Sequence, residues 1–198
     1  VKLIYTREDD MTNGVYRPAY YATYRAALDE NKNLLAFHVK AGGIPESPLH
    51  ANRFPAGAIE HYLAEEWDIP TNISVGAFRA PASNFIAGAE QSFLDELAEA
   101  MGKDPIQFRL ELCEKAKSKP VGKDNDYEID RYAGVLKLVR EKSGWGTPAA
   151  PGVARGVASY FCHRSYVAHV VDIVMKNNKP VIEKVTTAVD CGIVVNPD

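Results

Sequence analysis

The sequence predicts an α+β protein in which antiparallel β units flank a helical middle. Two observations indicate the β units: residues 19–42 and residues 153–190 both alternate as strands do, with polar turn residues between the runs. A third observation places helices between them, because apolar side chains recur at three- and four-residue spacing over residues 83–101. With 46% hydrophobic residues, the 198-residue chain has enough apolar material to bury the core of such a fold.

The first β unit begins the chain. Residues 1–6 alternate and are strand-like, and residues 19–42 are typical of a hairpin that turns at residues 29–33. Residues 44–55 contain three prolines and indicate a surface loop. A short helix is predicted over residues 56–66, ahead of the main helical region.

The middle of the chain carries the strongest helix signal, over residues 83–101, and Gly102 ends it. A second helix begins at once, because Asp104-Pro105 supplies an N-cap and a proline for the first helical position. That helix is predicted to reach residue 116. After a polar loop, a third helix is predicted over residues 130–142.

The second β unit follows a linker at residues 148–152. Its three strands are predicted over residues 153–162, 166–176 and 181–190. We therefore expect two portions: residues 1–147, a β hairpin unit plus helices, and residues 148–198, a three-stranded β unit.

The composition excludes two classes of partner. The formal net charge is −3, so the chain lacks the basic surplus that contacts with nucleic acid require. No apolar run approaches the roughly 20 residues needed to cross a bilayer, so we expect no membrane insertion. Cys113, Cys162 and Cys191 have neither disulfide-framework nor metal-knuckle spacing and are interpreted as buried free thiols.

Both ends of the sequence are interpreted as internal to a larger protein. The first residue already belongs to a strand-like run, and residues 188–198 form an apolar strand that runs into an Asn-Pro turn with nothing after it. We therefore expect a fragment that does not complete a catalytic cycle alone. An export signal would precede Val1, so the sequence predicts no compartment.

Several clusters of polar residues favour solvated or structural roles over a metal site. The run Arg7-Glu8-Asp9-Asp10 is interpreted as an exposed, charged strand end. His163 and His169 would lie roughly 20 Å apart on a continuous strand, and only a turn near Arg164 would bring them together. We assign no metal ligand and no catalytic residue. A Cys162 nucleophile paired with either histidine is the weakest alternative.

One segment stands apart from these clusters. Gly76, Ala77, Phe78 and Arg79 form a loop of small residues, one aromatic and one arginine, directly before the main helix. Backbone amides at the positive end of a helix suit an anionic or oxo-bearing ligand, and Arg79 adds a positive charge. An equally open interpretation is a packing turn, with Phe78 in the core and Arg79 capping a neighbouring element.

Gly76-Ala77-Phe78-Arg79 is followed by residues 93–109, and residues 1–18, 165–168 and 189–197 surround these two blocks. Together they resemble the molybdopterin-binding large subunit of the xanthine oxidase/aldehyde oxidase family. The order of the blocks is most similar to the isoquinoline 1-oxidoreductase beta subunits of that family. The resemblance implies a fold that is part of an aldehyde oxidase/xanthine dehydrogenase molybdopterin-binding domain.

The resemblance also implies a molybdenum hydroxylase, an oxidoreductase that inserts water-derived oxygen at a carbon of an N-heteroaromatic or aldehyde substrate. It implies a molybdenum–molybdopterin cytosine dinucleotide cofactor and a small [2Fe-2S] subunit as partner. By position, Gly76, Ala77, Phe78 and Arg79 would lie at the cofactor, with the Phe-Arg pair facing the substrate approach. In such enzymes the protein shapes the site and the cofactor performs the oxidation.

The sequence departs from the family pattern in ways that matter for activity. Residues 80–84 replace the glycine-rich residues that often follow the Phe-Arg pair, and neither the upstream glycine-rich cofactor loop nor the downstream glycine-flanked glutamate base has a counterpart. Glu8, Glu90 and Glu96 do not replace that base, because each is interpreted as part of a solvated surface. We therefore expect no cofactor bound to this fragment. The alternative is a non-catalytic module of the same architecture that binds a small molecule or a protein.

Overall fold

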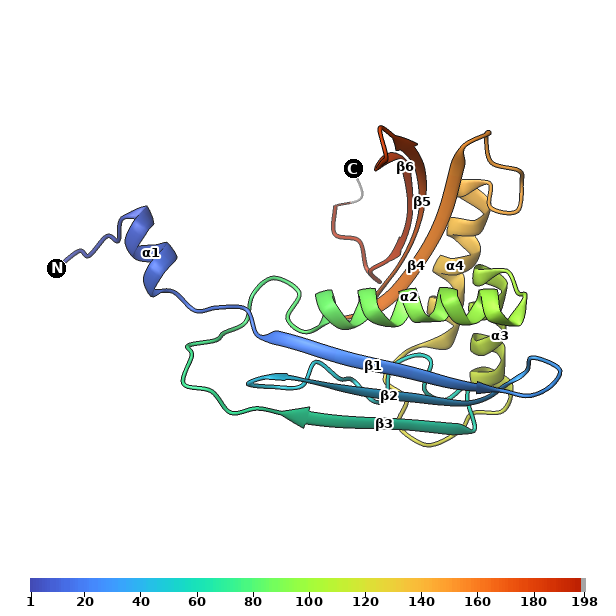
Figure 1. The fold of residues 1–198 in the computed structure, drawn as a ribbon, viewed down its shortest axis with the longest axis horizontal. Helices are drawn as coiled ribbons and strands as arrows, with labels where there is room; N and C mark the ends of the chain where they lie inside the picture. The colour runs from blue at the N-terminus through green and yellow to red at the C-terminus, as the bar shows by residue number, and fades with distance from the viewer. Residues whose placement is uncertain (197–198) are drawn as a thin grey trace.

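The structure is a computed structural model that describes residues 1–196. In chain order the elements are α1 (Arg7–Asn13), β1 (Ala19–Leu28), β2 (Leu34–Ile44), β3 (His61–Asp68), α2 (Ser83–Met101), α3 (Pro105–Ser118), α4 (Ile129–Ser143), β4 (Val153–Cys162), β5 (Ser165–Lys176) and β6 (Lys179–Asp190) (Figure 1). The Asn-Pro turn expected at the end of the chain includes Pro197 and Asp198 and lies outside the described residues.

Strands β1, β2 and β3 form the first sheet, in that order. β1 and β2 pair antiparallel, with Ala22 opposite Ala41, which confirms the predicted hairpin. β3 runs parallel to β2, so the helix predicted over residues 56–66 is wrong, and so is the expectation that every pair is antiparallel. Tyr62 and Ala64 of β3 alternate onto the core face. Parallel pairing joins segments distant in sequence, and no local pattern reveals it.

The connection between β2 and β3 is not the surface loop that its prolines indicate. Phe54, Ala56, Ala58 and Ile59 are all buried. The Phe54 ring stacks on Tyr132 of α4, with 4.7 Å between the ring centroids. A parallel pair requires a crossover, and here the apolar side chains of that crossover fill part of the core.

The second sheet is the antiparallel meander β4-β5-β6, which confirms the three predicted strands. The β4–β5 turn is made by His163 and Arg164, with φ of 50° and 60°. Asn177 and Asn178 make the β5–β6 turn with φ of 51° and 58°. Two consecutive residues in the left-handed region give the strand twist that a two-residue hairpin needs, and asparagine tolerates that conformation.

The three long helices lie between and beside the sheets. α2 contacts both β1 and β4, α4 covers β5 and β6, and α3 packs on α2 and α4 (Figure 1). The predicted caps are present: Gly102 ends α2 in the left-handed conformation, and the Asp104 carboxylate accepts the Gln107 N–H at 2.8 Å. One buried cluster includes Leu94, Leu136 and Val157, which come from α2, α4 and β4. The division between residues 147 and 148 stays a prediction.

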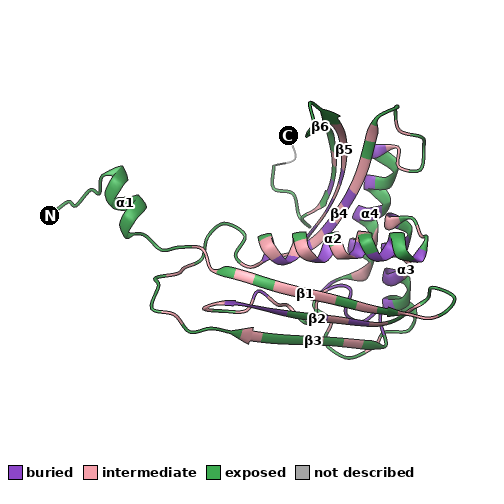
Figure 2. Cartoon of the chain, in the orientation of Figure 1, coloured by how far each residue is buried: buried purple, intermediate pink, exposed green. Residues whose placement is uncertain are grey.

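Residues 1–6, expected to be strand-like, form no strand, and a helix begins at Arg7, where a charged strand end was expected. Thr6 caps α1 through a capping box with Asp9, and the acidic run stabilises the positive end of this helix instead of ending a strand. α1 buries no residue and projects away from the rest of the chain (Figure 1). Figure 2 shows that exposed residues also dominate the edge strands β3 and β6. The α+β class is confirmed, with one parallel pair as the departure.

Candidate functional site

The loop of residues 76–79, called the 76–79 loop below, is joined to the segment just before β1. The Tyr16 N–H donates to the Ser74 carbonyl at 2.9 Å, and the Gly76 N–H donates to the Tyr16 carbonyl at 3.0 Å. Tyr16 and Val75 thereby form an isolated parallel bridge. A Cβ on Gly76 would lie 2.9 Å from the nearest Val15 methyl carbon, so glycine permits this close approach.

Phe78 and Arg79 face solvent, and Arg17 contacts both residues. The Phe78 side chain is 61% exposed, so the alternative of a packing turn with a core phenylalanine is wrong. Arg17 Nη2 donates to the Arg79 carbonyl at 2.9 Å, and the Arg17 guanidinium carbon lies 4.6 Å from the Phe78 ring centroid. This is a cation–π contact. Among residues 1–196 the Arg79 guanidinium forms no hydrogen bond or ion pair.

The chain leaves the loop through two strained residues. Ala80 and Ala82 have φ of 55° and 57°, which costs of the order of 1–3 kcal/mol for a residue with a side chain. The first amides of α2 are already used, because Asn84 donates to Ala80 O at 3.2 Å and Phe85 to Ala82 O at 3.0 Å. The unpaired amides lie before α2, in the loop itself: within the described chain, the exposed residues 77–80 donate no N–H hydrogen bond.

The glutamates considered as a substitute base do not lie on the loop. Glu8 and Glu96 are exposed, as expected, but Glu90 is buried at 8% exposure, so its assignment to a solvated face is wrong. Burial raises the pKa of Glu90 to about 8. Its carboxyl group lines a small internal space with Arg53 and Tyr132. α2 is covered on two sides, by β1 and by β4, which the single apolar stripe did not reveal.

The histidines and cysteines do not form a metal cluster. The hairpin turn at His163 and Arg164 exists, yet within residues 1–196 no three His, Cys, Asp or Glu side chains gather as ligands. His169 Nδ1 instead lies 2.8 Å from Thr187 Oγ1 on β6. Cys162 Sγ lies 3.3 Å from Ser83 Oγ at the start of α2. All three cysteines are free thiols, but only Cys113 is buried.

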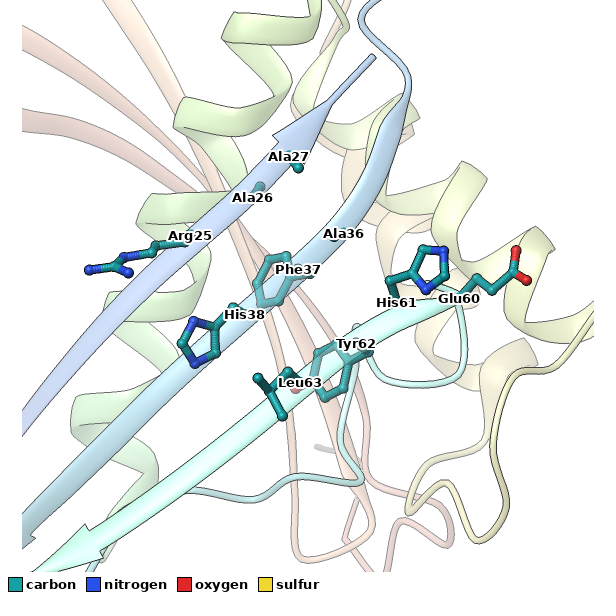
Figure 3. Close-up of a pocket in the computed structure, with 10 residues that line it drawn as sticks. All are labelled: Arg25, Ala26, Ala27, Ala36, Phe37, His38, Glu60, His61, Tyr62 and Leu63. Carbon is teal, nitrogen blue, oxygen red and sulfur yellow. The ribbon is translucent and has the colours of Figure 1, made fainter.

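A shallow pocket of about 610 Å³ lies on the first sheet, and none of the residues of the 76–79 loop lines it (Figure 3). Arg25, His38 and Leu63 are register neighbours on β1, β2 and β3 and form part of its wall. His38 Nε2 is paired with Glu65 Oε2 at 2.7 Å, so its polar group is already engaged. The pocket is open sheet surface and is separate from the loop.

The family comparison identifies a molybdopterin cofactor-binding domain. The chain belongs to that family, because residues 1–112 match the family described as Molybdopterin cofactor-binding domain. This family forms part of the large subunits of xanthine oxidase and aldehyde oxidoreductase type, and the predicted resemblance is confirmed. The matched residues include the 76–79 loop and Arg17.

Two curated relatives align with the whole chain. The isoquinoline 1-oxidoreductase subunit beta of Brevundimonas diminuta is 26% identical over 100% of this chain and 26% of its own length. The membrane-bound aldehyde dehydrogenase [pyrroloquinoline-quinone] of Gluconacetobacter polyoxogenes is 27% identical over 100% of this chain and 30% of its own length. The chain thus spans less than a third of either relative.

A solved structure supports the fold. The aldehyde oxidoreductase of Desulfovibrio gigas superposes with a TM-score of 0.54 and 17% identity, over 83% of this chain and 19% of that chain. None of the helices among residues 1–196 is long and apolar enough to cross a membrane.

The loop has the chemistry to contact such a cofactor. Its groups are donors: the unpaired amides of residues 77–80 and the Arg79 guanidinium, neither of which has a hydrogen-bond partner among the described residues. Molybdopterin cofactors carry phosphate and oxo oxygens, and amides and guanidinium groups are the donors that bind such oxygens. The residues present therefore fit the group.

The sequence did not identify Arg17 as part of this site. The residue lies in the first block of the resemblance, directly before Pro18, but 62 positions separate it from Arg79. The only sequence signal that could have pointed to Arg17 was its place within that block. No spacing rule connects residues so far apart.

Proposed function

We propose that this chain forms one wall of the active site in a molybdenum hydroxylase, an oxidoreductase that hydroxylates an aldehyde or N-heteroaromatic carbon with water-derived oxygen. The observation that carries the proposal is the 76–79 loop, which presents an exposed ring, a free guanidinium and unpaired amides in a molybdopterin cofactor-binding domain. The substrate classes are suggested by the names of the relatives, an isoquinoline oxidoreductase and an aldehyde dehydrogenase.

In this proposal the residues of the chain bind the cofactor and orient the substrate. The amides of residues 77–80 and the Arg79 guanidinium donate to oxygens of the bound cofactor, proposed to be the molybdenum–molybdopterin cytosine dinucleotide. The exposed face of Phe78 offers an aromatic substrate a stacking surface. When bound, the cofactor supplies the two-electron oxidation.

The proton transfer is assigned to a group outside the described residues. Glu90 is enclosed between α2 and the two sheets, and Glu8 and Glu96 lie on exposed helix surfaces. A general base must reach the proton that it removes, and none of these carboxylates lies on the loop. We therefore expect residues 1–198 alone to be inactive, with a small [2Fe-2S] subunit as partner of the intact enzyme. The name of one relative, isoquinoline 1-oxidoreductase subunit beta, supports a multi-subunit assembly.

The test uses the protein as its gene encodes it, purified with any partner that remains bound. We expect about one molybdenum atom per large subunit by metal analysis, and oxidation of benzaldehyde or isoquinoline. Phe78→Ala and Arg79→Ala should lower kcat/KM by about 10- to 100-fold, since each removes a contact to the reacting groups. Arg25→Ala, on the open sheet surface, should not.

Three results would contradict the proposal: no molybdenum in the intact protein, loop variants that behave as wild type, or stoichiometric molybdenum in residues 1–198 alone. Bound pyrroloquinoline quinone in place of molybdenum would favour the redox chemistry in the name of the Gluconacetobacter relative. Binding of a small anion without any redox group would favour the non-catalytic module.

A further inference from the structure

The 76–79 loop does not hold its own shape. Residues 77–80 are exposed and donate no backbone hydrogen bond within the described chain, and Ala80 has a φ of 55°. A segment with few internal contacts and a strained residue keeps one conformation only if neighbouring groups fix it. Its restraint must therefore come from other parts of the chain.

Two contacts from residues 15–17 hold the loop. The first is the backbone bridge of Tyr16, which accepts the Gly76 N–H at 3.0 Å. The second is the Arg17 side chain, whose Nη2 donates to the Arg79 carbonyl at 2.9 Å. Among residues 1–196, Arg17 supplies the only side-chain hydrogen bond to residues 76–80.

Arg17 fixes a side chain as well as the backbone. Its guanidinium lies 4.6 Å from the Phe78 ring centroid, so one planar group stacks on the ring and donates to the next residue's carbonyl. A lysine ammonium is a point charge without a planar face, so it could donate to the carbonyl but could not cover the ring in the same way. The two contacts together set the position of the ring and of the peptide that follows it.

We infer that Arg17 is the positioning residue of the 76–79 loop: it stacks on Phe78 and holds the Arg79 peptide, so that the ring presents its free face to an aromatic substrate. The effect on substrate rests on the proposed function. The effect on loop order does not, because it follows from contacts within the chain.

The first arm of the experiment measures amide hydrogen exchange in the gene-encoded protein. Arg17→Met should speed exchange at least fivefold at the two hydrogen-bonded amides of the bridge, those of Tyr16 and Gly76, and leave α3 unchanged. Arg17→Lys should give an intermediate increase. The matched control is Arg25→Met, at an exposed arginine on β1 whose side chain makes no hydrogen bond among the described residues. Unchanged exchange in Arg17→Met would overturn the inference.

The second arm compares two aldehydes in the intact enzyme. Arg17→Met should raise KM for benzaldehyde by about tenfold, because the ring loses its stacked partner, and change KM for acetaldehyde less than twofold. In Phe78→Leu the same Arg17 substitution should add little, because the residue that it positions is already gone. Equal increases for both aldehydes would show general damage and overturn the positioning role.

The two arms separate the two proposals. A protein without molybdenum or aldehyde oxidation fails the proposed function, and hydrogen exchange then decides alone whether Arg17 orders the loop. An active enzyme with normal exchange and normal benzaldehyde KM in Arg17→Met keeps the function and removes the role of Arg17.

Discussion

Arg109 Nε donates to Gln91 Oε1 at 2.9 Å, and the same oxygen accepts the Ser159 N–H at 3.0 Å. Arg109 is fully buried, and its Nη2 also donates to the Gln91 carbonyl at 3.0 Å. Asp95 Oδ1 lies 2.7 Å from Arg109 Nη1, so the two side chains form an ion pair. One side-chain amide thus joins α3, α2 and β4.

Arg109→Met should destabilise the protein strongly, because it removes the cation and leaves Asp95 without its charge partner in a half-buried position. Breaking a buried ionic contact typically costs about 3–5 kcal/mol of the free energy of unfolding. Urea denaturation measures this change. The control is Arg140→Met, an exposed arginine on α4, which should cost less than about 0.5 kcal/mol. Equal losses in the two variants would contradict the role of the buried network.

Glu90 should make stability depend on pH. Burial raises its folded-state pKa from 4.5 to about 8. The folded state therefore holds the proton more tightly, and its stability is greatest below pH 4.5 and falls as pH rises towards 8. The fall amounts to at most about 5 kcal/mol, at 1.36 kcal/mol per pKa unit. The charged and titratable groups that affect its environment are Arg53, Arg109, Tyr24, Tyr62, Tyr127, Tyr132 and Tyr160.

Glu90→Gln should remove this fall, because glutamine keeps the shape of a protonated carboxyl and does not ionise. The variant should match wild type near pH 4 and exceed its free energy of unfolding near pH 8. Glu96→Gln, on the exposed side of the same helix, serves as control and should follow the wild-type curve. Parallel curves for wild type and Glu90→Gln would show that Glu90 is ionised in the folded state.

Gly42→Ala should destabilise the first sheet. A Cβ on Gly42 would overlap the ring and the carbonyl oxygen of Trp67, which covers this glycine from β3. Overpacking of this kind costs about 1–3 kcal/mol, and displacement of the indole should shift its fluorescence. Gly88→Ala is the matched control: nothing lies within 4 Å of its Cβ position, and alanine in a helix should stabilise by about 0.5–1 kcal/mol.

The three thiols should react in the order of their exposure. Cys191 is exposed, Cys162 is partly exposed and Cys113 is buried. Burial raises the pKa of Cys113 to about 12, so almost none of it is thiolate at pH 8. Labelling with a disulfide reagent at pH 8, followed by peptide mass spectrometry, should modify Cys191 first and Cys113 only on unfolding. Early modification of Cys113 would show that this part of the core opens.

Local patterns were enough to predict the long elements. α2 carries its stripe and its glycine stop in its own sequence, and the Asp104 cap and the three strands after residue 153 are equally local signals. Two of the failures share one cause, which is that a tertiary partner decides the local structure. β3 is a strand because it pairs with β2, and Phe54 is buried because the crossover packs on Tyr132.

The candidate site was only partly predictable, because some of its contacts are local in the sequence and others are not. The 76–79 loop was found from residues that are contiguous in the chain, whereas its contact with Arg17 crosses 62 positions. Glu90 was misjudged because one helix period describes one buried face, and α2 has two neighbours on different sides. The order of the blocks indicated the family, but only the folded structure shows which side chain contacts the loop.

The ties to the 76–79 loop come from residues 15–17, which contribute no side chain to the buried core. Warming should therefore release this short parallel bridge well before the sheets and helices come apart. Heat inactivation of such an enzyme would then precede its main calorimetric transition, and it would be reversible on cooling as long as the core stays intact.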